Sequence, residues 1–272
     1  MSSRSFLEST LQSFAKALSR ALLAERAAHE RGLLQQLDPR VRLVGILGLV
    51  VAVTLCRRVE AVVALFAAAI GLALLSKINL WSLCKRVWIV VLGFTGLIAL
   101  PALFLTPGEE WKTLPWLHWT ITKPGLHTAV LLVLRVETAA TLTTILVLCT
   151  PWTHILKALR ALRVSPEIVA MLAMTHRYAF LLIETANQMF ESRQSRMVGI
   201  LSPKDRRRVA ARTAGVLLSK SVELSQEVYL AMISRGFQGE IRLLSEFRMT
   251  ARDYAGLVVF LASGVVVAWW GR

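Results

Sequence analysis

The side chains that could hold a metal ion or carry out acid–base chemistry are few, and their spacing forms no metal or catalytic motif. The three cysteines lie inside or beside apolar runs without a C-x-x-C spacing: Cys56, Cys84 and Cys149. The five histidines include no H-E-x-x-H motif and no pair at helical i, i+4 spacing: His29, His118, His127, His154 and His176. Zinc sites need such clusters. We therefore expect no metal site and no catalytic residue in this chain.

A site for ATP hydrolysis is not evident either. A phosphate-binding loop requires the pattern G-x-x-x-x-G-K-S/T, and the nearest segment, from Gly71 to Lys77, lacks the second glycine. The chain therefore needs partners if its work is driven by ATP. An intramembrane enzyme built on Glu137 or Glu184 with His176 is the remaining enzyme hypothesis, and no recognisable nucleophile–base or metal motif accompanies these residues.

Two charged residues, Arg135 and Glu137, lie near the middle of the long apolar run 126–149. An unpaired charge at this depth of a membrane costs at least about 2.5 kcal/mol, so it normally faces protein or water. Residues two apart on a helix point to different faces and cannot pair neatly. We expect contacts with other spans or with a membrane partner. The alternative is an ion or proton pathway, which would make the chain a transporter in its own right.

The composition explains why such charges need a protein environment. Of the 272 residues 55% are hydrophobic and only 18% are charged, and the mean hydropathy is +0.57. A soluble domain of this size is less apolar, so much of the surface must lie in lipid. The net charge of +15 is typical of basic loops that face the cytoplasm. Nucleic-acid binding is disfavoured because the apolar spans leave little room for a solvated basic face.

The apolar runs predict an all-α polytopic membrane protein with about five transmembrane helices. A hairpin of two short spans comes first, followed by a loop over residues 107–125 between the third and fourth spans. An amphipathic helix over 6–23 precedes them, too polar to span, and it lies either on the membrane surface or against the cytoplasmic part of the chain. The five predicted spans cover residues 43–56, 61–75, 87–105, 126–149 and 254–270.

The distribution of lysine and arginine predicts the orientation. Basic side chains concentrate in residues 1–42, 76–86 and 151–252, which places the N-terminus in the cytoplasm. Arg57 and Arg58 are the exception to this rule. The chain then divides into an N-terminal amphipathic cytoplasmic helix, transmembrane helices 1–4, a cytoplasmic part and transmembrane helix 5, with the boundaries 1–36, 37–150, 151–252 and 253–272.

The cytoplasmic part carries 16 Lys or Arg against 8 Asp or Glu and has clear helix start signals. A hydroxyl side chain stands before proline at Thr150-Pro151, Ser165-Pro166 and Ser202-Pro203, the pattern of a cap followed by proline at the first helical position. Asp205 strengthens the third start as an analogue of a capping box. The pattern predicts two long helices, from Pro166 to about Val198 and from Pro203 to about Arg235, each about 50 Å long.

Both long helices end in a serine and an arginine, with glycine close behind: Ser195-Arg196 with Gly199, and Ser234-Arg235 with Gly236. Helix capping alone explains such an ending. In the second helix, however, an apolar stripe leads onto the face that bears the arginine. An apolar stripe that ends in a cation is typical of a helix laid in a partner's groove. The stripe contains Leu224, Val228 and Met232.

These features resemble the transmembrane T component of energy-coupling factor (ECF) transporters, of the cobalt/nickel CbiQ type. The resemblance covers nearly the whole chain and includes the amphipathic start and both arginine-containing helix ends. The ending 234–237 matches the family's Ala-Arg-Gly-like signature best, and the first copy departs from it because Met197 follows Arg196. Further matching segments are residues 37–41, 150–152 and 175–178.

The resemblance implies a non-enzymatic coupling subunit in the bacterial cytoplasmic (inner) membrane. Arg196 and Arg235 would each engage one of two cytoplasmic ATP-binding-cassette ATPases, which hold ATP and Mg. A membrane substrate-binding S component would hold cobalt or nickel, and this chain would bind no cofactor. The alternatives are a self-sufficient permease and a T component for another micronutrient such as a vitamin. The residues predicted for ATPase docking are Ser195, Arg196, Leu224, Val228, Met232, Ser234, Arg235 and Gly236.

Overall fold

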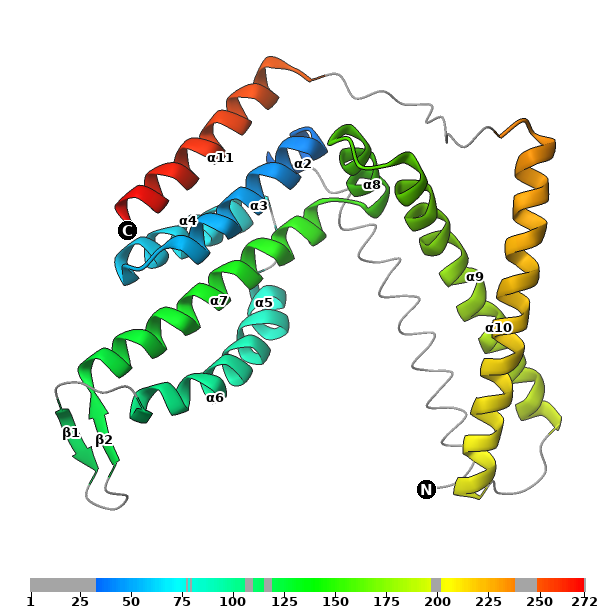
Figure 1. Ribbon diagram of the computed structural model, residues 1–272, viewed down its shortest axis with the longest axis horizontal. Helices are drawn as coiled ribbons and strands as arrows, with labels where there is room; N and C mark the ends of the chain where they lie inside the picture. Colours follow the sequence, from blue (N-terminus) through cyan, green and yellow to red (C-terminus); the bar gives the residue numbers. More distant parts are fainter. Residues whose placement is uncertain are drawn as a thin grey trace. The chain divides into compact units, whose positions relative to one another are not determined.

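The computed structural model describes residues 33–76, 78, 80–105, 110–114, 119–196, 202–237 and 249–271. The predicted amphipathic helix over 6–23 lies outside them. The described chain is helical apart from two short strands, and the prediction of an all-α polytopic membrane protein is confirmed. It forms two compact units (Figure 1). One, here the membrane unit, covers residues 27–158 and 247–272, and the other contains residues 159–246.

Each of the five predicted spans is a helix in the membrane unit. The helices are α3 (Pro39–Leu55), α4 (Val59–Leu75), α6 (Ile89–Leu105), α7 (Lys123–Cys149) and α11 (Ala251–Trp270). Short helical segments complete the unit: α2 (Leu33–Gln36), α5 (Leu80–Leu83) and the π-helical turn η1 (Cys84–Trp88). Helices α7 and α11 are long and apolar enough to cross a membrane. At 17 residues each, α3, α4 and α6 reach about 25 Å, somewhat less than a hydrocarbon core.

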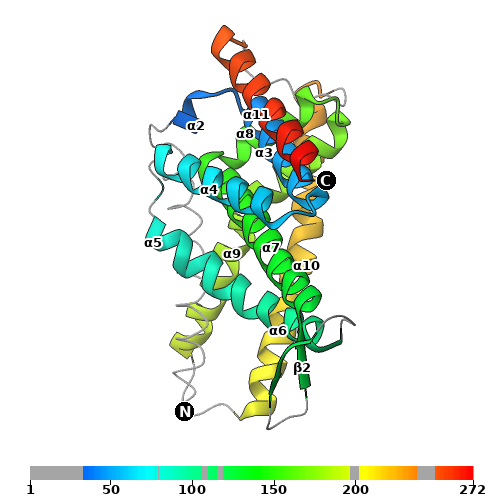
Figure 2. The same cartoon turned by 90° about the vertical axis from the view of Figure 1, so that its left-hand side faces the viewer.

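The hydrogen bonds at the helix ends fix the directions of three of these helices. Helices α3 and α11 run parallel, because the backbone N–H of Asp38 donates to Asp253 Oδ1 (2.7 Å) at their starts. At their far ends the N–H of Arg57 donates to the carbonyl of Gly271 (2.7 Å). Helix α7 runs the other way, since its last residue, Cys149, accepts a bond from Arg42 Nη1 (2.6 Å) near the start of α3. Figure 2 shows these helices together. Relative to one another, these three helices have the directions predicted for spans one, four and five.

Glycine brings α3 and α11 close together. A Cβ at Gly45 would stand 2.7 Å from Cγ of the buried Phe260, which is closer than real Cβ contacts. On the other helix, a Cβ at Gly264 would lie 3.7 Å from Leu49, in ordinary contact. Small residues at a helix–helix contact are typical of membrane proteins, where close backbone packing replaces the hydrophobic effect.

The prediction of a loop over residues 107–125 was wrong in part. Strands β1 (Glu110–Leu114) and β2 (Trp119–Thr122) pair there as an antiparallel hairpin, and α7 begins at Lys123 instead of residue 126. The early helix start has a local cause. The Thr122 Oγ1 accepts a hydrogen bond from the N–H of Gly125 (3.3 Å), and Pro124 occupies the first turn.

The remaining helices begin where the hydroxyl–proline pairs predict. They are α8 (Trp152–Ala161), α9 (Pro166–Arg196) and α10 (Pro203–Ser234). Helix α10 ends one residue earlier than predicted, and the predicted end of α9 at Val198 lies outside the described residues. Ser202 caps α10, because its Oγ accepts a hydrogen bond from the N–H of Asp205 (3.2 Å) and donates to that carboxylate (2.7 Å). By length and composition α9 would also qualify as a membrane span, and only 6% of its apolar window is buried.

Candidate functional site

Helices α9 and α10 form an antiparallel hairpin, drawn side by side in Figure 1. One hollow is shared by residues 167–182 of α9 and 221–237 at the end of α10, and a second hollow is shared by residues 185–196 and 212–216. The start of each helix therefore lies beside the end of the other. Arg196 and Arg235, which end the two helices, are thus separated by nearly the whole hairpin, or about 45 Å at 1.5 Å per residue.

The serines that precede the two arginines make the same hydrogen bond. Ser195 Oγ donates to the carbonyl of Ser192 (2.9 Å), and Ser234 Oγ donates to the carbonyl of Ala231 (2.9 Å). Arg196 and Arg235 are both exposed. In the part of the chain that the structure describes, neither guanidinium forms an ion pair. Each helix thus presents a free cation at its end, although the following residues differ.

Gly236 ends α10 as a cap. Its φ of +78° is in the left-handed region that favours glycine. The N–H of Gly236 donates to the carbonyl of Ile233 (2.9 Å), and the N–H of Phe237 donates to the carbonyl of Met232 (3.0 Å). These two bonds form a Schellman motif. The glycine of the predicted docking set therefore has a structural role, which places Arg235 at the turn.

The predicted apolar stripe of α10 faces α9. Leu224, Val228 and Met232 are partly buried and line a groove of about 460 Å³ between the two helices. The facing side of the groove is also apolar and is rich in methionine, with Met171 and Met174 from α9. These three stripe residues therefore face the groove that α10 shares with α9.

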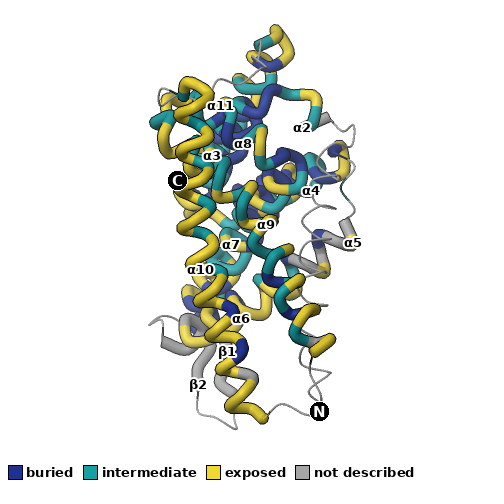
Figure 3. Tube along the Cα trace, turned by 90° about the vertical axis from the view of Figure 1, so that its right-hand side faces the viewer, coloured by how far each residue is buried: buried dark blue, intermediate teal, exposed yellow. Residues whose placement is uncertain are grey.

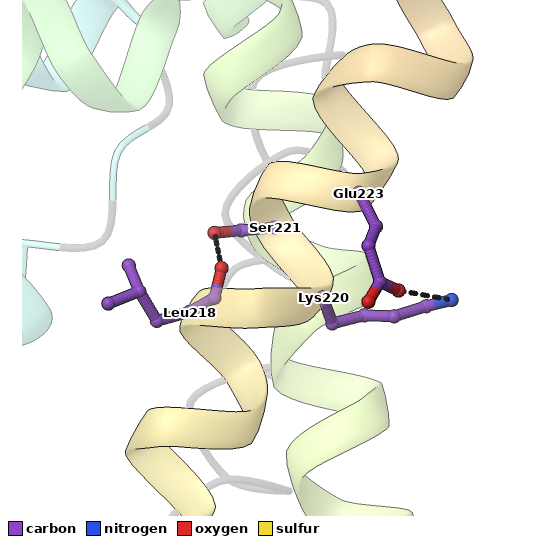
Figure 4. Close-up of polar contacts among 4 residues, drawn as sticks. All are labelled: Leu218, Lys220, Ser221 and Glu223. Atoms are coloured by element: carbon purple, nitrogen blue, oxygen red, sulfur yellow. Dashed lines mark hydrogen bonds and ion pairs between the residues drawn. The ribbon is translucent and has the colours of Figure 1, made fainter.

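Sequence reasoning missed a second apolar stripe on α10. Figure 3 shows most of this helix as exposed. Large apolar side chains along a neighbouring face of α10 are between 48% and 69% exposed: Leu218, Val222, Tyr229 and Ile233, of which Tyr229 also lines the groove beside α9. Their spacing of four, seven and four residues is helical and could have revealed the stripe. Polar contacts on the same helix join residues only three positions apart (Figure 4). Lys220 forms an exposed ion pair with Glu223, and the Ser221 hydroxyl donates to the carbonyl of Leu218.

The two charged residues of α7 have different environments. Arg135 Nη2 donates to the carbonyl of Cys56 (2.5 Å) just beyond the end of α3, so it contacts another part of the membrane unit. Glu137 is 5% exposed, and neither of its carboxylate oxygens has a hydrogen-bond partner among the described residues. The two side chains do not pair with each other.

A buried polar cluster joins the starts of α3 and α11 to the end of α7. Asp253 accepts hydrogen bonds from the N–H of Asp38 and from both the N–H and the hydroxyl of Thr250. Arg42, which is 3% exposed, bridges the carbonyls of Leu37 and Cys149. Sequence analysis overlooked this cluster, although a threonine three residues before an aspartate is a helix-start signal. Among the described residues no three His, Cys, Asp or Glu side chains gather as a metal site would require.

The comparisons with known proteins identify the family. The model of the cobalt transport protein family CbiQ matches residues 30–245. The chain belongs to the CbiQ family. Its relatives include an uncharacterised protein of Methanocaldococcus jannaschii, 29% identical over 92% of this chain and 87% of the relative. The energy-coupling factor transporter transmembrane protein EcfT of Brevibacillus brevis is 24% identical over 87% of this chain and 93% of the relative.

A shorter match has the family's own name. The cobalt transport protein CbiQ of Rhodobacter capsulatus is 26% identical over 53% of this chain and 59% of that protein. Together with the family model, these relatives show that the chain is a transmembrane component of cobalt or ECF-type transport. The resemblance found in the sequence is therefore confirmed.

Proposed function

We propose that this CbiQ-family chain is the coupling (T) subunit of an ATP-driven ECF-type cobalt/nickel uptake transporter in the cytoplasmic (inner) membrane. It links two cytoplasmic ATP-binding-cassette ATPases to a membrane S component that binds the metal. The observation that carries this proposal is the pair of exposed arginine ends, Arg196 and Arg235, on one antiparallel hairpin. The sequence also has no phosphate-binding loop of its own, so the energy must come from partners.

The geometry of the hairpin supports two ATPase contacts instead of one. Because α9 and α10 are antiparallel, a single groove cannot receive both arginine ends, which are about 45 Å apart. Two similar ends with the same serine and arginine fit two similar partner grooves. An arginine suits an acidic groove end, since its guanidinium forms paired hydrogen bonds with a carboxylate. In this scheme ATP binding brings the ATPases together, and both helix ends move with them.

In this proposal the S component, and not this chain, determines which metal is transported. Cobalt or nickel is held by the S component, and ATP and Mg by the ATPases, while this chain contributes no ligand. The name of the Rhodobacter relative supports cobalt as one cargo. The membrane unit carries the motion of the helix ends to the S component. The polar cluster at Asp253 and Arg42 joins three of the spans, so these three spans move together when the helix ends move.

The test is purification of the tagged chain from its native membrane. We expect mass spectrometry to find ATP-binding-cassette ATPases and a second membrane protein in the same complex, with cobalt or nickel bound. The reconstituted complex should take up metal into liposomes only with ATP. The purified chain alone should transport none. Metal uptake by the chain alone would contradict the proposal and support the self-sufficient permease.

A further inference from the structure

The buried polar cluster of the membrane unit lies close in the chain to both connections with the α9–α10 hairpin. We call it the Arg42–Asp253 cluster, and it consists of Asp38, Arg42, Cys149 and Asp253. Cys149 ends α7, from which the chain continues through α8 into α9, and Asp253 lies in the first turn of α11, the helix that follows α10. The chain thus leaves the membrane unit soon after α7 and returns to it just before α11.

Both connections are bound to one short segment, the start of α3. The backbone N–H of Asp38 donates to Asp253 Oδ1 (2.7 Å), which holds the start of α11. One turn later Arg42 Nη1 donates to the carbonyl of Cys149 (2.6 Å), which holds the end of α7. The Arg42 Nε donates to the carbonyl of Leu37 (3.0 Å), so the guanidinium is fixed in place. The start of α3 therefore joins the outgoing chain to the returning chain.

Helix capping explains only part of this arrangement. Asp253 Oδ2 accepts hydrogen bonds from the N–H and the hydroxyl of Thr250, which completes the cap of its own helix. The side chain of Asp38 likewise caps its own helix by accepting from the N–H of Arg40 (2.9 Å). The two bonds between helices are additional to these caps, and they join residues 215 and 107 positions apart.

The charges of the cluster favour a rigid arrangement. Asp38, Arg42 and Asp253 are 7%, 3% and 5% exposed, so water competes little for their bonds. Each charge also lies at the helix end that suits its sign, with the aspartates at helix starts and Arg42 against the carbonyl that ends α7. Arg42 attracts both carboxylates. Separation of the three helix ends would leave buried charges without partners, which is strongly unfavourable.

We propose that the Arg42–Asp253 cluster is a coupling site that makes the two chain connections of the hairpin move together. Motion that ATP causes at the two arginine ends then reaches the membrane unit as one displacement instead of two independent ones. Arg42 and Asp253 are positioning residues, because they act through α3. This role in transport rests on the proposed function, whereas the joint behaviour of the two connections is a property of the chain alone.

The first test uses the purified full-length chain in detergent and hydrogen exchange. The variant R42M removes the bond to α7, and we expect faster exchange at the start of α11 as well, by about fivefold or more, the lower end of ordinary coupling between two sites. The matched control T250A removes a hydroxyl bond within α11 and leaves both bonds between helices, so its effect should stay within α11. Unchanged exchange at the start of α11 in R42M would overturn the proposal.

The second test measures the metal transported per ATP hydrolysed by the reconstituted complex. A variant that merely unfolds some complexes lowers uptake and hydrolysis together and leaves this ratio unchanged. We expect R42M to lower the ratio about fivefold or more, with the ATPases still bound. D253N should do the same if R42M fails to fold, since it leaves one acceptor oxygen for the donors of Asp38 and Thr250. T250A should keep the wild-type ratio.

Two transport results would overturn the proposal. One is a wild-type ratio in both R42M and D253N, and the other is an equal fall in T250A, which would assign the effect to the cap of α11. A wild-type complex without ATPases, or without metal uptake, would instead contradict the proposed function. Hydrogen exchange in the isolated chain decides in that case whether the cluster joins the two connections.

Discussion

At the scale of single residues, Glu137 is a buried acid whose described surroundings do not stabilise its carboxylate. It lies within α7 and is 5% exposed, and neither carboxylate oxygen has a hydrogen-bond partner among the described residues. A buried acceptor without a partner costs about 1–3 kcal/mol. Arg135, two residues earlier, is instead bound to the carbonyl of Cys56. Glu137 is therefore a residue whose presence weakens the isolated fold.

Replacement of Glu137 by methionine, a side chain of similar length without polar oxygens, should stabilise the isolated chain. We expect E137M to raise the free energy of unfolding by about 1–3 kcal/mol because it removes the unpaired group. The measurement is denaturant unfolding in detergent micelles. The control E184M changes an exposed glutamate of α9 and should shift stability by less than about 0.5 kcal/mol. A loss of stability in E137M would mean that the carboxyl has a partner within the chain.

Sequence alone predicted which residues are unusual but not what they touch. The position of Arg135 and Glu137 in an apolar run was visible, and their failure to pair followed from the helical spacing. The bond from Arg135 to the end of α3 depends on how α7 packs, which no local pattern records. Asp253 and Arg42 were overlooked for the same reason, since their partners lie 215 and 107 residues away in the chain.

At the scale of helices, the contact between α3 and α11 depends on glycine. The missing Cβ of Gly45 makes room for Phe260, whose side chain is 8% exposed and so has little space to move. The polar bonds at the two ends of this helix pair set its direction, and the glycine sets how closely the helices approach. A side chain at this position would separate them.

The variant G45A tests this contact. The new Cβ would stand 2.7 Å from Phe260 Cγ, so we expect a loss of about 1–3 kcal/mol in the free energy of unfolding. The smaller F260L side chain should recover part of the loss in the double variant. The control G93A places a methyl group in open space on α6, where alanine favours a helix over glycine by up to about 1 kcal/mol. Equal effects of G45A and G93A would contradict close packing at Gly45.

The helices themselves were largely predictable because their boundaries are encoded locally. Proline after Ser165 and Ser202 marks the starts of the two long helices, and Gly236 marks the end of the second. The strands β1 and β2 were missed because short hairpin strands lack a long periodic pattern. The predicted stripe of Leu224, Val228 and Met232 was a real apolar face. It packs toward α9, however, and a single helix could not reveal which neighbour it meets.

At the scale of the whole molecule, the central feature is the hairpin with one arginine at each end. Sequence predicted two matched helices, and the antiparallel pairing adds that their arginines are far apart. That separation is our reason for proposing two ATPase contacts. The stripe of Leu218, Val222, Tyr229 and Ile233 is a further exposed apolar surface on α10.

The most direct test of this account is recovery of ATPases with the tagged chain after charge reversal at both arginines. We predict that R196E/R235E lowers recovery of both ATPases at least tenfold, because loss of a buried charge contact at an interface costs about 2–5 kcal/mol at each end. Each single reversal should leave one contact. The control K204E/R208E reverses two exposed charges at the start of α10, where glutamate suits the helix dipole, and should retain both ATPases. Circular dichroism should show the same helix content in all variants. Full ATPase recovery with folded R196E/R235E would contradict the account.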